Sequence, residues 1–166
     1  MRYQSEPLTD RHELDQFSSS NAELDDWLIR HARHAAAMNT GRTFVWHSGD
    51  DRVVAFFTLA AHRIRRTLIA RKVGRGSPEE IPAVLLARLA LDESLHGRGL
   101  GGEVLWDALT RAVAAGTIAA ARLVVVEAVN DAAAEFYKHH GFIPSPDDSH
   151  QLVLKISEIA KSLGLT

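Results

Sequence analysis

The sequence contains no cysteine, and this absence removes several kinds of chemistry at once. Disulfide bonds, thiolate metal sites and a cysteine nucleophile are all excluded. Long apolar runs are missing too, since the longest, Ala112–Val129, is interrupted by Gly116, Thr117, Arg122 and Glu127. A membrane-spanning helix needs about 20 predominantly apolar residues, so we expect no membrane contact. The first residues also lack an apolar stretch of signal-peptide length, which predicts a cytoplasmic protein.

The composition is that of a globular domain. Of 166 residues, 46% are hydrophobic and 24% are charged, and a chain of this length has room for one domain or two. Repeats, low-complexity tracts and breaks in composition are absent, so we expect a single domain over residues 1–166.

The net charge of −2 hides an uneven distribution. Between His62 and Pro78 no residue is acidic, and the basic residues there are Arg63, Arg65, Arg66, Arg71, Lys72 and Arg75. A local basic block in a near-neutral protein fits contact with a polyanion. A solvated cationic loop explains the same pattern.

Apolar periodicity and turn residues outline the secondary structure. Helices are expected over Glu23–Met38 and over Leu100–Ala115, the second stopped by Gly116. The remaining expectations are a hairpin of Arg42–His47 with Arg52–Leu59, a loop at Arg71–Pro82, strands at Ala83–Asp92, Arg122–Val129 and Gln151–Ile156, a short helix at Asp131–His140 and a last helix capped by Ser157. This order predicts a mixed α/β or α+β single domain.

The most informative segment is a glycine-dense turn between the strand ending near Leu91 and the helix starting at Leu100. It contains Gly97, Gly99, Gly101 and Gly102. Glycine allows positive φ and close backbone approach, and a helix N-terminus attracts anions. These properties predict a cradle for a pyrophosphate, although a turn without a ligand remains an alternative.

The spacing of Gly97, Gly99 and Gly102 formally matches the dinucleotide-binding fingerprint. That fingerprint belongs to the first strand of a βαβ unit and is followed by an acidic residue. Here a long segment precedes the glycines, and Ala112–Arg122 offers no such acid. A Gly-Lys-Ser/Thr sequence is also missing, so neither dinucleotide binding nor a P-loop is favoured.

Residues 96–101, His-Gly-Arg-Gly-Leu-Gly, resemble the Arg/Gln-x-x-Gly-x-Gly/Ala motif of the GNAT acetyltransferases, with His96 in the first position. A second GNAT-like motif runs from Asn130 through Phe136 and Tyr137 to Gly141 and Phe142. The resemblance implies a mixed sheet splayed around acetyl-CoA and flanked by helices, with Tyr137 beside the thioester. It implies these cofactor contacts: Leu89, Ala90, Leu91, His96, Gly97, Arg98, Gly99, Leu100, Gly101, Gly102, Asn130 and Phe136.

Residues 17–28, 87–92 and 133–146 further resemble the GNAT toxins of bacterial toxin–antitoxin pairs, the TacT- and AtaT-type proteins. The resemblance implies acetylation of the α-amino group of aminoacyl-tRNA, a block of translation and neutralisation by a ribbon-helix-helix antitoxin. It leaves a homodimer open. With this resemblance the basic block is expected to contact tRNA phosphates.

The chemistry expected of such a site needs a proton for the departing thiolate, and Tyr137 is the candidate because a phenol stays protonated at neutral pH. An alternative role for Tyr137 is packing beside Phe136 and Phe142. No general base stands out, and Glu127 is a weak candidate. An α-amine titrates at about 7.7–8.0 and needs less help than a lysine. No metal is expected.

Arg88 lies inside an apolar strand, where an unpaired charge is rarely buried. We expect either an ion pair with Asp92 or Glu127, or a place at the mouth where the tRNA acceptor enters. Two other functions remain open. The protein could acetylate a small amine or a protein amino group, or it could bind acyl-CoA without catalysis.

Overall fold

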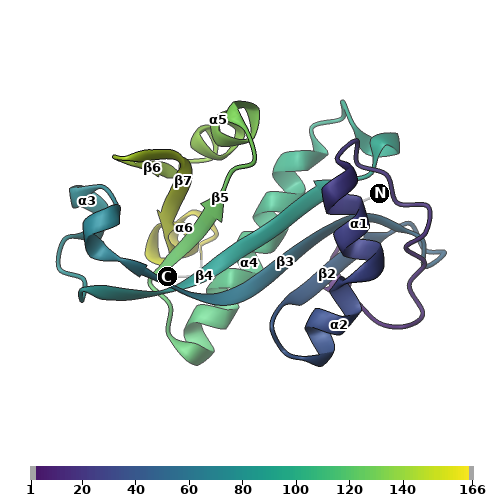
Figure 1. Ribbon diagram of the computed structural model, residues 1–166, viewed down its shortest axis with the longest axis horizontal. Helices are drawn as coiled ribbons and strands as arrows, with labels where there is room; N and C mark the ends of the chain where they lie inside the picture. The colour runs from purple at the N-terminus through teal and green to yellow at the C-terminus, as the bar shows by residue number, and fades with distance from the viewer. Residues whose placement is uncertain (1–2, 165–166) are drawn as a thin grey trace. The chain divides into compact units, whose positions relative to one another are not determined.

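The computed structural model describes residues 3–164 and forms a seven-stranded mixed sheet with flanking helices. The strand order is β1-β2-β3-β4-β5-β7-β6 (Figure 1). The chain divides into two compact units. The first contains the described residues up to Ala60 together with Ala87–Ala108, and the second contains Ala61–Leu86 together with the described residues from Leu109 onward. The predicted mixed α/β class is confirmed.

The first unit is built on antiparallel strands. β1 pairs with β2, and β2 pairs with β3; this second pair is the predicted hairpin, in which β3 extends beyond the predicted end. Its elements are β1 (Glu6–Pro7), α1 (Ala22–Arg30), α2 (Ala32–Ala37), β2 (Arg42–His47), the first part of β3 (Val53–Arg65), the end of β4 (Glu80–Leu91), η2 (Glu93–Leu95) and the start of α4 (Leu100–Ala119).

The single helix expected over Glu23–Met38 is wrong in one respect, because the chain breaks at His31 into α1 and α2. The α1 helix is capped by Asn21, whose side chain accepts a hydrogen bond from the backbone N–H of Leu24 at 3.2 Å. Leu28 and Ala32 are fully buried in a core with Val45, Phe56 and other apolar side chains. This packing fixes α1 and α2 on the strands of the hairpin (Figure 1).

The second unit contains a parallel and two antiparallel ladders. β4 pairs parallel with β5, while β7 pairs antiparallel with both β5 and β6. The elements that complete this unit are η1 (Arg66–Leu68), α3 (Arg71–Gly74), β5 (Leu123–Glu127), α5 (Asp131–His139), β6 (Ile143–Ser145), β7 (Asp148–Lys155) and α6 (Ile156–Ser162). The expected loop at Arg71–Pro82 is wrong at both ends, because it begins with α3 and ends inside β4.

Two helix boundaries also differ from expectation. Gly116 does not stop α4, which continues to Ala119; a Cβ at Gly116 would lie 3.1 Å from the Ile156 side chain. The glycine therefore serves close packing rather than termination. Ser157 does not cap α6, which begins at Ile156 after Lys155 without a side-chain cap. None of the described helices is long and apolar enough to cross a membrane.

Candidate active site

The end of β4 extends beyond its partner strand. The ladder between β4 and β5 ends at the pair of Leu86 with Val126, whereas β4 continues to Leu91. The predicted cofactor contacts Leu89, Ala90 and Leu91 all lie past this last pair. Ala90 is buried in the core of the first unit, and Leu89 and Leu91 are half-buried. Their position gives a strand segment whose backbone is not used by the β4–β5 ladder.

The turn that follows, the cradle loop (residues 92–99), is fastened by Asp92. This carboxylate is only 3% exposed and accepts hydrogen bonds from the Ser18 backbone N–H at 3.0 Å and from the Ser94 hydroxyl at 2.7 Å. Burial raises the pKa of Asp92, but these hydrogen bonds outweigh it and hold the pKa below its usual value. The buried carboxylate is therefore ionised at neutral pH and ties the loop to residue 18.

Two further contacts fix the same loop. The backbone N–H of Glu93 donates to the Ser18 carbonyl at 2.8 Å, and the Ser20 hydroxyl donates to the Glu93 carboxylate at 2.5 Å. His96 Nε2 lies 2.7 Å from the carbonyl oxygen of Leu91. Because a carbonyl only accepts, the imidazole donates from Nε2 and joins the strand end to the loop. The His96 side chain, where the GNAT motif has Arg or Gln, is thus engaged by its own backbone.

Gly97 and Gly99 form the tip of the cradle loop with φ values of 79° and 71°. A Cβ built on either glycine meets no atom within 4 Å, so open space faces both residues. The α4 helix starts at Leu100 immediately afterwards, and Gly101 and Gly102 lie in its first turn. A helix N-terminus that follows two such glycines, with open space beside them, fits a pyrophosphate. Arg98 is exposed in the same loop.

The α5 helix carries the predicted tyrosine and begins with a side-chain cap. The Asn130 side chain accepts a hydrogen bond from the Ala133 backbone N–H at 2.8 Å. Asn130, predicted to contact the cofactor, therefore also determines where the helix starts. Phe136, the other predicted contact on this helix, packs against the rings of Tyr137 and His140.

Tyr137 is packed edge-on between two aromatic rings. Its ring centroid lies 5.3 Å from that of Phe136 and 5.4 Å from that of Phe142. Burial raises the pKa of Tyr137 to about 12, so the phenol is protonated throughout the physiological range. No hydrogen bond to its hydroxyl is formed within residues 3–164, which leaves the O–H group available as a donor.

Arg88 corrects an expectation. It forms neither of the predicted ion pairs, and its guanidinium carbon instead lies 3.8 Å from the ring centroid of Trp27 on α1. Asp92 is occupied by Ser18 and Ser94. The face of an aromatic ring attracts a partly desolvated cation, so Trp27 can stabilise Arg88 without a carboxylate.

The basic residues that precede β4 divide into two groups. Arg65 pairs with Glu80 at 3.5 Å, and Arg66 donates to the Ser77 carbonyl at 2.6 Å. The exposed members to which the described residues provide neither an ion pair nor a side-chain hydrogen bond are Arg63, Arg71, Lys72 and Arg75.

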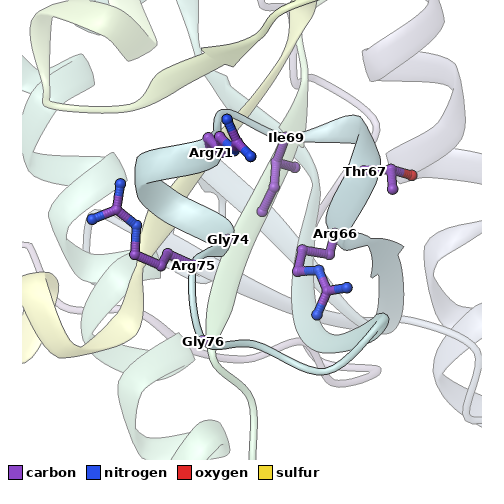
Figure 2. A pocket seen from close by; sticks show the side chains of 7 residues that line it. All are labelled: Arg66, Thr67, Ile69, Arg71, Gly74, Arg75 and Gly76. Atoms are coloured by element: carbon purple, nitrogen blue, oxygen red, sulfur yellow. The ribbon is translucent and has the colours of Figure 1, made fainter.

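Residues of the basic loop (residues 66–79) line an open pocket of about 610 Å³. Figure 2 shows the guanidinium groups of Arg66, Arg71 and Arg75 pointing in different directions around it. Ile69 and Val73 anchor this loop in the core of the second unit. At Gly74 a Cβ would lie 3.0 Å from the Arg66 side chain, which would have to shift to admit a larger residue. The buried side chains of Ile69 and Val73 therefore fix the backbone of a loop whose cationic side chains are exposed.

Comparison with known proteins shows the family to which the chain belongs. Residues 8–142 match the model of the acetyltransferase (GNAT) family. The chain belongs to the GNAT family of acetyltransferases. It is 35% identical to the tRNA-acetylating toxin of Mycobacterium tuberculosis (strain ATCC 25618 / H37Rv), with 95% of this chain and 94% of the toxin covered. The predicted resemblance to GNAT toxins is thereby confirmed.

Two solved structures of the toxin AtaT are similar to this acetyltransferase over almost all of both chains. AtaT complexed with acetyl-methionyl-tRNAfMet is 26% identical, with a TM-score of 0.86 and coverage of 99% of this chain and 98% of AtaT. An AtaT mutant bound to the C-terminus of the antitoxin AtaR and acetyl-CoA is 25% identical, with a TM-score of 0.82 and coverage of 97% and 98%. The predicted enzyme class, an acetyltransferase with acetyl-CoA as donor, is confirmed.

Among residues 3–164 of the acetyltransferase, Glu6, His12 and His47 form one group of potential metal ligands. The Thr9 and Gly49 backbone N–H groups donate to Nδ1 of His12 and His47, each at 3.0 Å. Each imidazole therefore carries its proton on Nε2, and these atoms lie 2.7 and 3.1 Å from the same Glu6 oxygen. The hydrogen bond from His12 lowers the pKa of Glu6. These contacts make a carboxylate–histidine network in which both Nε2 atoms are donors rather than metal ligands.

The structure also reveals residues that the sequence analysis missed. Ser18 and Ser20 hold the cradle loop, and Trp27 holds Arg88. Trp27 lies in a segment that resembles the toxins, but nothing in the linear sequence connects it with Arg88. A run of three serines before a capped helix was the available signal for a structured turn.

Proposed function

We propose that this acetyltransferase is a toxin that transfers the acetyl group of acetyl-CoA to the α-amino group of aminoacyl-tRNA and so blocks translation. The observation that carries the proposal is the 35% identity to a tRNA-acetylating toxin over 95% of the chain. The unpaired cations of the second unit support it, because lysine and arginine contacts to phosphate supply affinity for RNA without base recognition.

In this proposal the cradle loop and the end of β4 bind acetyl-CoA. The backbone of Leu89, Ala90 and Leu91 bonds the pantetheine arm, and residues 96–102 hold the pyrophosphate. The open space in front of Gly97 and Gly99 supports this assignment. Asn130 and Phe136 contribute from α5. The acetyl-CoA thioester supplies the activated acyl group.

Tyr137 is proposed to act as the general acid. Its phenol, kept protonated by a pKa of about 12, donates a proton to the sulfur as the C–S bond breaks, and the phenolate regains a proton from the nitrogen that has formed the amide bond. The acceptor must be a neutral amine, and an α-amine titrates at about 7.7–8.0. We propose that the reaction uses neither a metal ion nor a dedicated general base, and that Glu127 does not serve as one.

Arg63, Arg65, Arg66, Arg71, Lys72 and Arg75 are proposed to contact tRNA, as is Arg88. Arg71, Lys72 and Arg75 are the residues to change in a binding test, since Arg66 holds its own loop through Ser77. Neutralising Arg66 would mix loss of binding with loss of loop structure.

The partners proposed are aminoacyl-tRNA and a ribbon-helix-helix antitoxin, with a homodimer left open. We propose that residues 1–166 act as one domain, since β3, β4 and α4 each continue from one unit into the other. We also propose action in the cytoplasm, where tRNA is aminoacylated.

The test is an acetylation assay with purified protein, acetyl-CoA and a mixture of aminoacylated tRNAs. We expect N-acetylated aminoacyl-adenosine after nuclease digestion, detected by mass spectrometry. Tyr137→Phe should lower kcat by about 10²–10⁴-fold, the range for loss of a general acid, while the Kd for acetyl-CoA stays unchanged. Acetylation of small amines or proteins but not of tRNA would contradict the tRNA substrate. A Tyr137→Phe protein that still arrests growth would instead indicate a binding module.

A further inference from the structure

Arg88, on β4, is a partly buried cation in contact with an aromatic ring. It is half-buried, and its guanidinium lies over the ring of Trp27 at 3.8 Å. Burial lowers the pKa of Arg88. Trp27 is itself fixed, because its ring stacks on Phe56 with 6.4 Å between centroids and 14° between planes. The guanidinium therefore rests on a rigid aromatic support.

Its hydrogen-bonding capacity is unused. Within residues 3–164 Arg88 has no hydrogen bond and no ion pair. Removing a cation from water without an anion is costly, and the Trp27 face recovers only part of that cost. Contact with the ring occupies one face of the planar group, so the N–H donors along its edge remain for an oxyanion. A planar fork of donors matches phosphate or carboxylate in two-point contact.

The position on the strand indicates which oxyanion. Arg88 lies one to three residues before Leu89–Leu91, the segment proposed to bond the pantetheine arm, so the thioester is proposed to lie within about 3–10 Å of it at about 3.3 Å per strand residue. In an aminoacylated nucleotide, the amine is connected to the 5′-phosphate through the ester and one ribose, a comparable reach. The phosphate nearest the reacting amine is therefore the one that a cation on this strand can bind.

We propose, on the basis of the proposed function, that Arg88 supported by Trp27 binds the 5′-phosphate of the terminal nucleotide of aminoacyl-tRNA. The contact orients the acceptor end and is separate from the distributed phosphate contacts of the basic loop. It makes Arg88 a residue that distinguishes aminoacyl-nucleotides from simple amines.

The experiment compares two small acceptors that differ by one phosphate. The probes are 3′-O-aminoacyl-adenosine and 3′-O-aminoacyl-adenosine 5′-monophosphate, charged with an amino acid that the tRNA assay identifies. For the wild-type enzyme we expect kcat/KM to be about tenfold higher with the phosphate, the size expected of one charge-assisted contact. Arg88→Gln should reduce this ratio to about one, and Arg88→Lys should restore part of it.

Arg30→Gln is the matched control. Arg30 is an exposed arginine on α1 that pairs with Asp26 at 2.8 Å, so its loss should leave the ratio unchanged. Calorimetry with acetyl-CoA checks that each variant is folded. Trp27→Leu is a second variant, which keeps the guanidinium, removes its support and should lower the ratio by less than Arg88→Gln.

The outcomes separate the two proposals. A wild-type ratio of one, with both acceptors acetylated, overturns the role of Arg88 and leaves the proposed function standing; this comparison requires no variant. Acetylation of neither probe and of no tRNA overturns both. A ratio that persists in Arg88→Gln, or an equal loss with both acceptors, also contradicts the phosphate contact. If Arg88→Gln weakens antitoxin binding and leaves the ratio intact, the guanidinium serves the antitoxin and the proposal is wrong.

Discussion

The cradle loop and the basic loop, which follow the two long strands of the molecule, are held in opposite ways. In the cradle loop Asp92, Glu93 and His96 all use their polar groups inside the first unit, and within residues 3–164 the Gly97 and Gly99 N–H groups donate no hydrogen bond. In the basic loop buried Ile69 and Val73 provide the anchor, and most of the charge remains exposed. A rigid backbone suits one small ligand of fixed shape, whereas spare charge suits a long polyanion.

The largest expected effect comes from filling the tip of the cradle loop. Gly99→Val places a β-branched side chain where the pyrophosphate is proposed to lie, and we expect the Kd for acetyl-CoA to rise beyond calorimetric detection. Gly76→Val is the matched control, because Gly76 has a similar φ of 79° and equally open surroundings in the basic loop. Both variants carry a left-handed backbone cost of roughly 1–2 kcal/mol. Equal acetyl-CoA binding by the two variants would remove the distinction between the loops.

The second prediction concerns the exposed cations of the basic loop. We expect the triple variant Arg71→Gln, Lys72→Gln, Arg75→Gln to weaken tRNA binding about tenfold at moderate salt and to reduce the slope of log K against log salt by about 2–3. Its acetyl-CoA affinity and melting temperature should match the wild type. Filter binding over a salt series measures the slope. An unchanged slope would assign these cations to solvent or to the antitoxin.

Asp92 gives a smaller effect, on stability. Asp92→Asn removes an ionised acceptor from a buried site, and we expect a loss of about 1–3 kcal/mol in the free energy of unfolding. Because the folded-state pKa of Asp92 is lowered, its stabilisation is present above the unfolded pKa and is lost as pH falls through the folded value. The difference between variant and wild type should therefore shrink below about pH 4. Denaturant titrations at several pH values check this, with exposed Asp26→Asn as the control.

Sequence reasoning reached the features that local chemistry determines. The hairpin followed from alternating strands around a turn, and the order of strand, glycine turn and helix followed from glycines between an apolar strand and a helical segment. Contacts between residues distant in the sequence could not be predicted from it. The break at His31, the packing of Gly116 against Ile156 and the stacking of Arg88 on Trp27 all depend on partners that the fold supplies. Charge alone suggested Asp92 for Arg88, but the two serines already occupy that carboxylate.

The smallest effect concerns the side chain in the first position of the GNAT-like motif. If His96 acts by holding the Leu91 carbonyl rather than by touching acetyl-CoA, then His96→Gln, whose amide can donate to the same oxygen, should bind acetyl-CoA within about twofold of the wild type. His96→Ala loses one hydrogen bond and should raise the KM for acetyl-CoA about fivefold, the scale of a single neutral bond, with kcat at saturation unaffected. Steady-state kinetics with varied acetyl-CoA separates the two parameters. A Gln variant as impaired as the Ala variant would mean that the imidazole itself contacts the ligand, and the cradle loop would then bind through side chains as the basic loop is proposed to do.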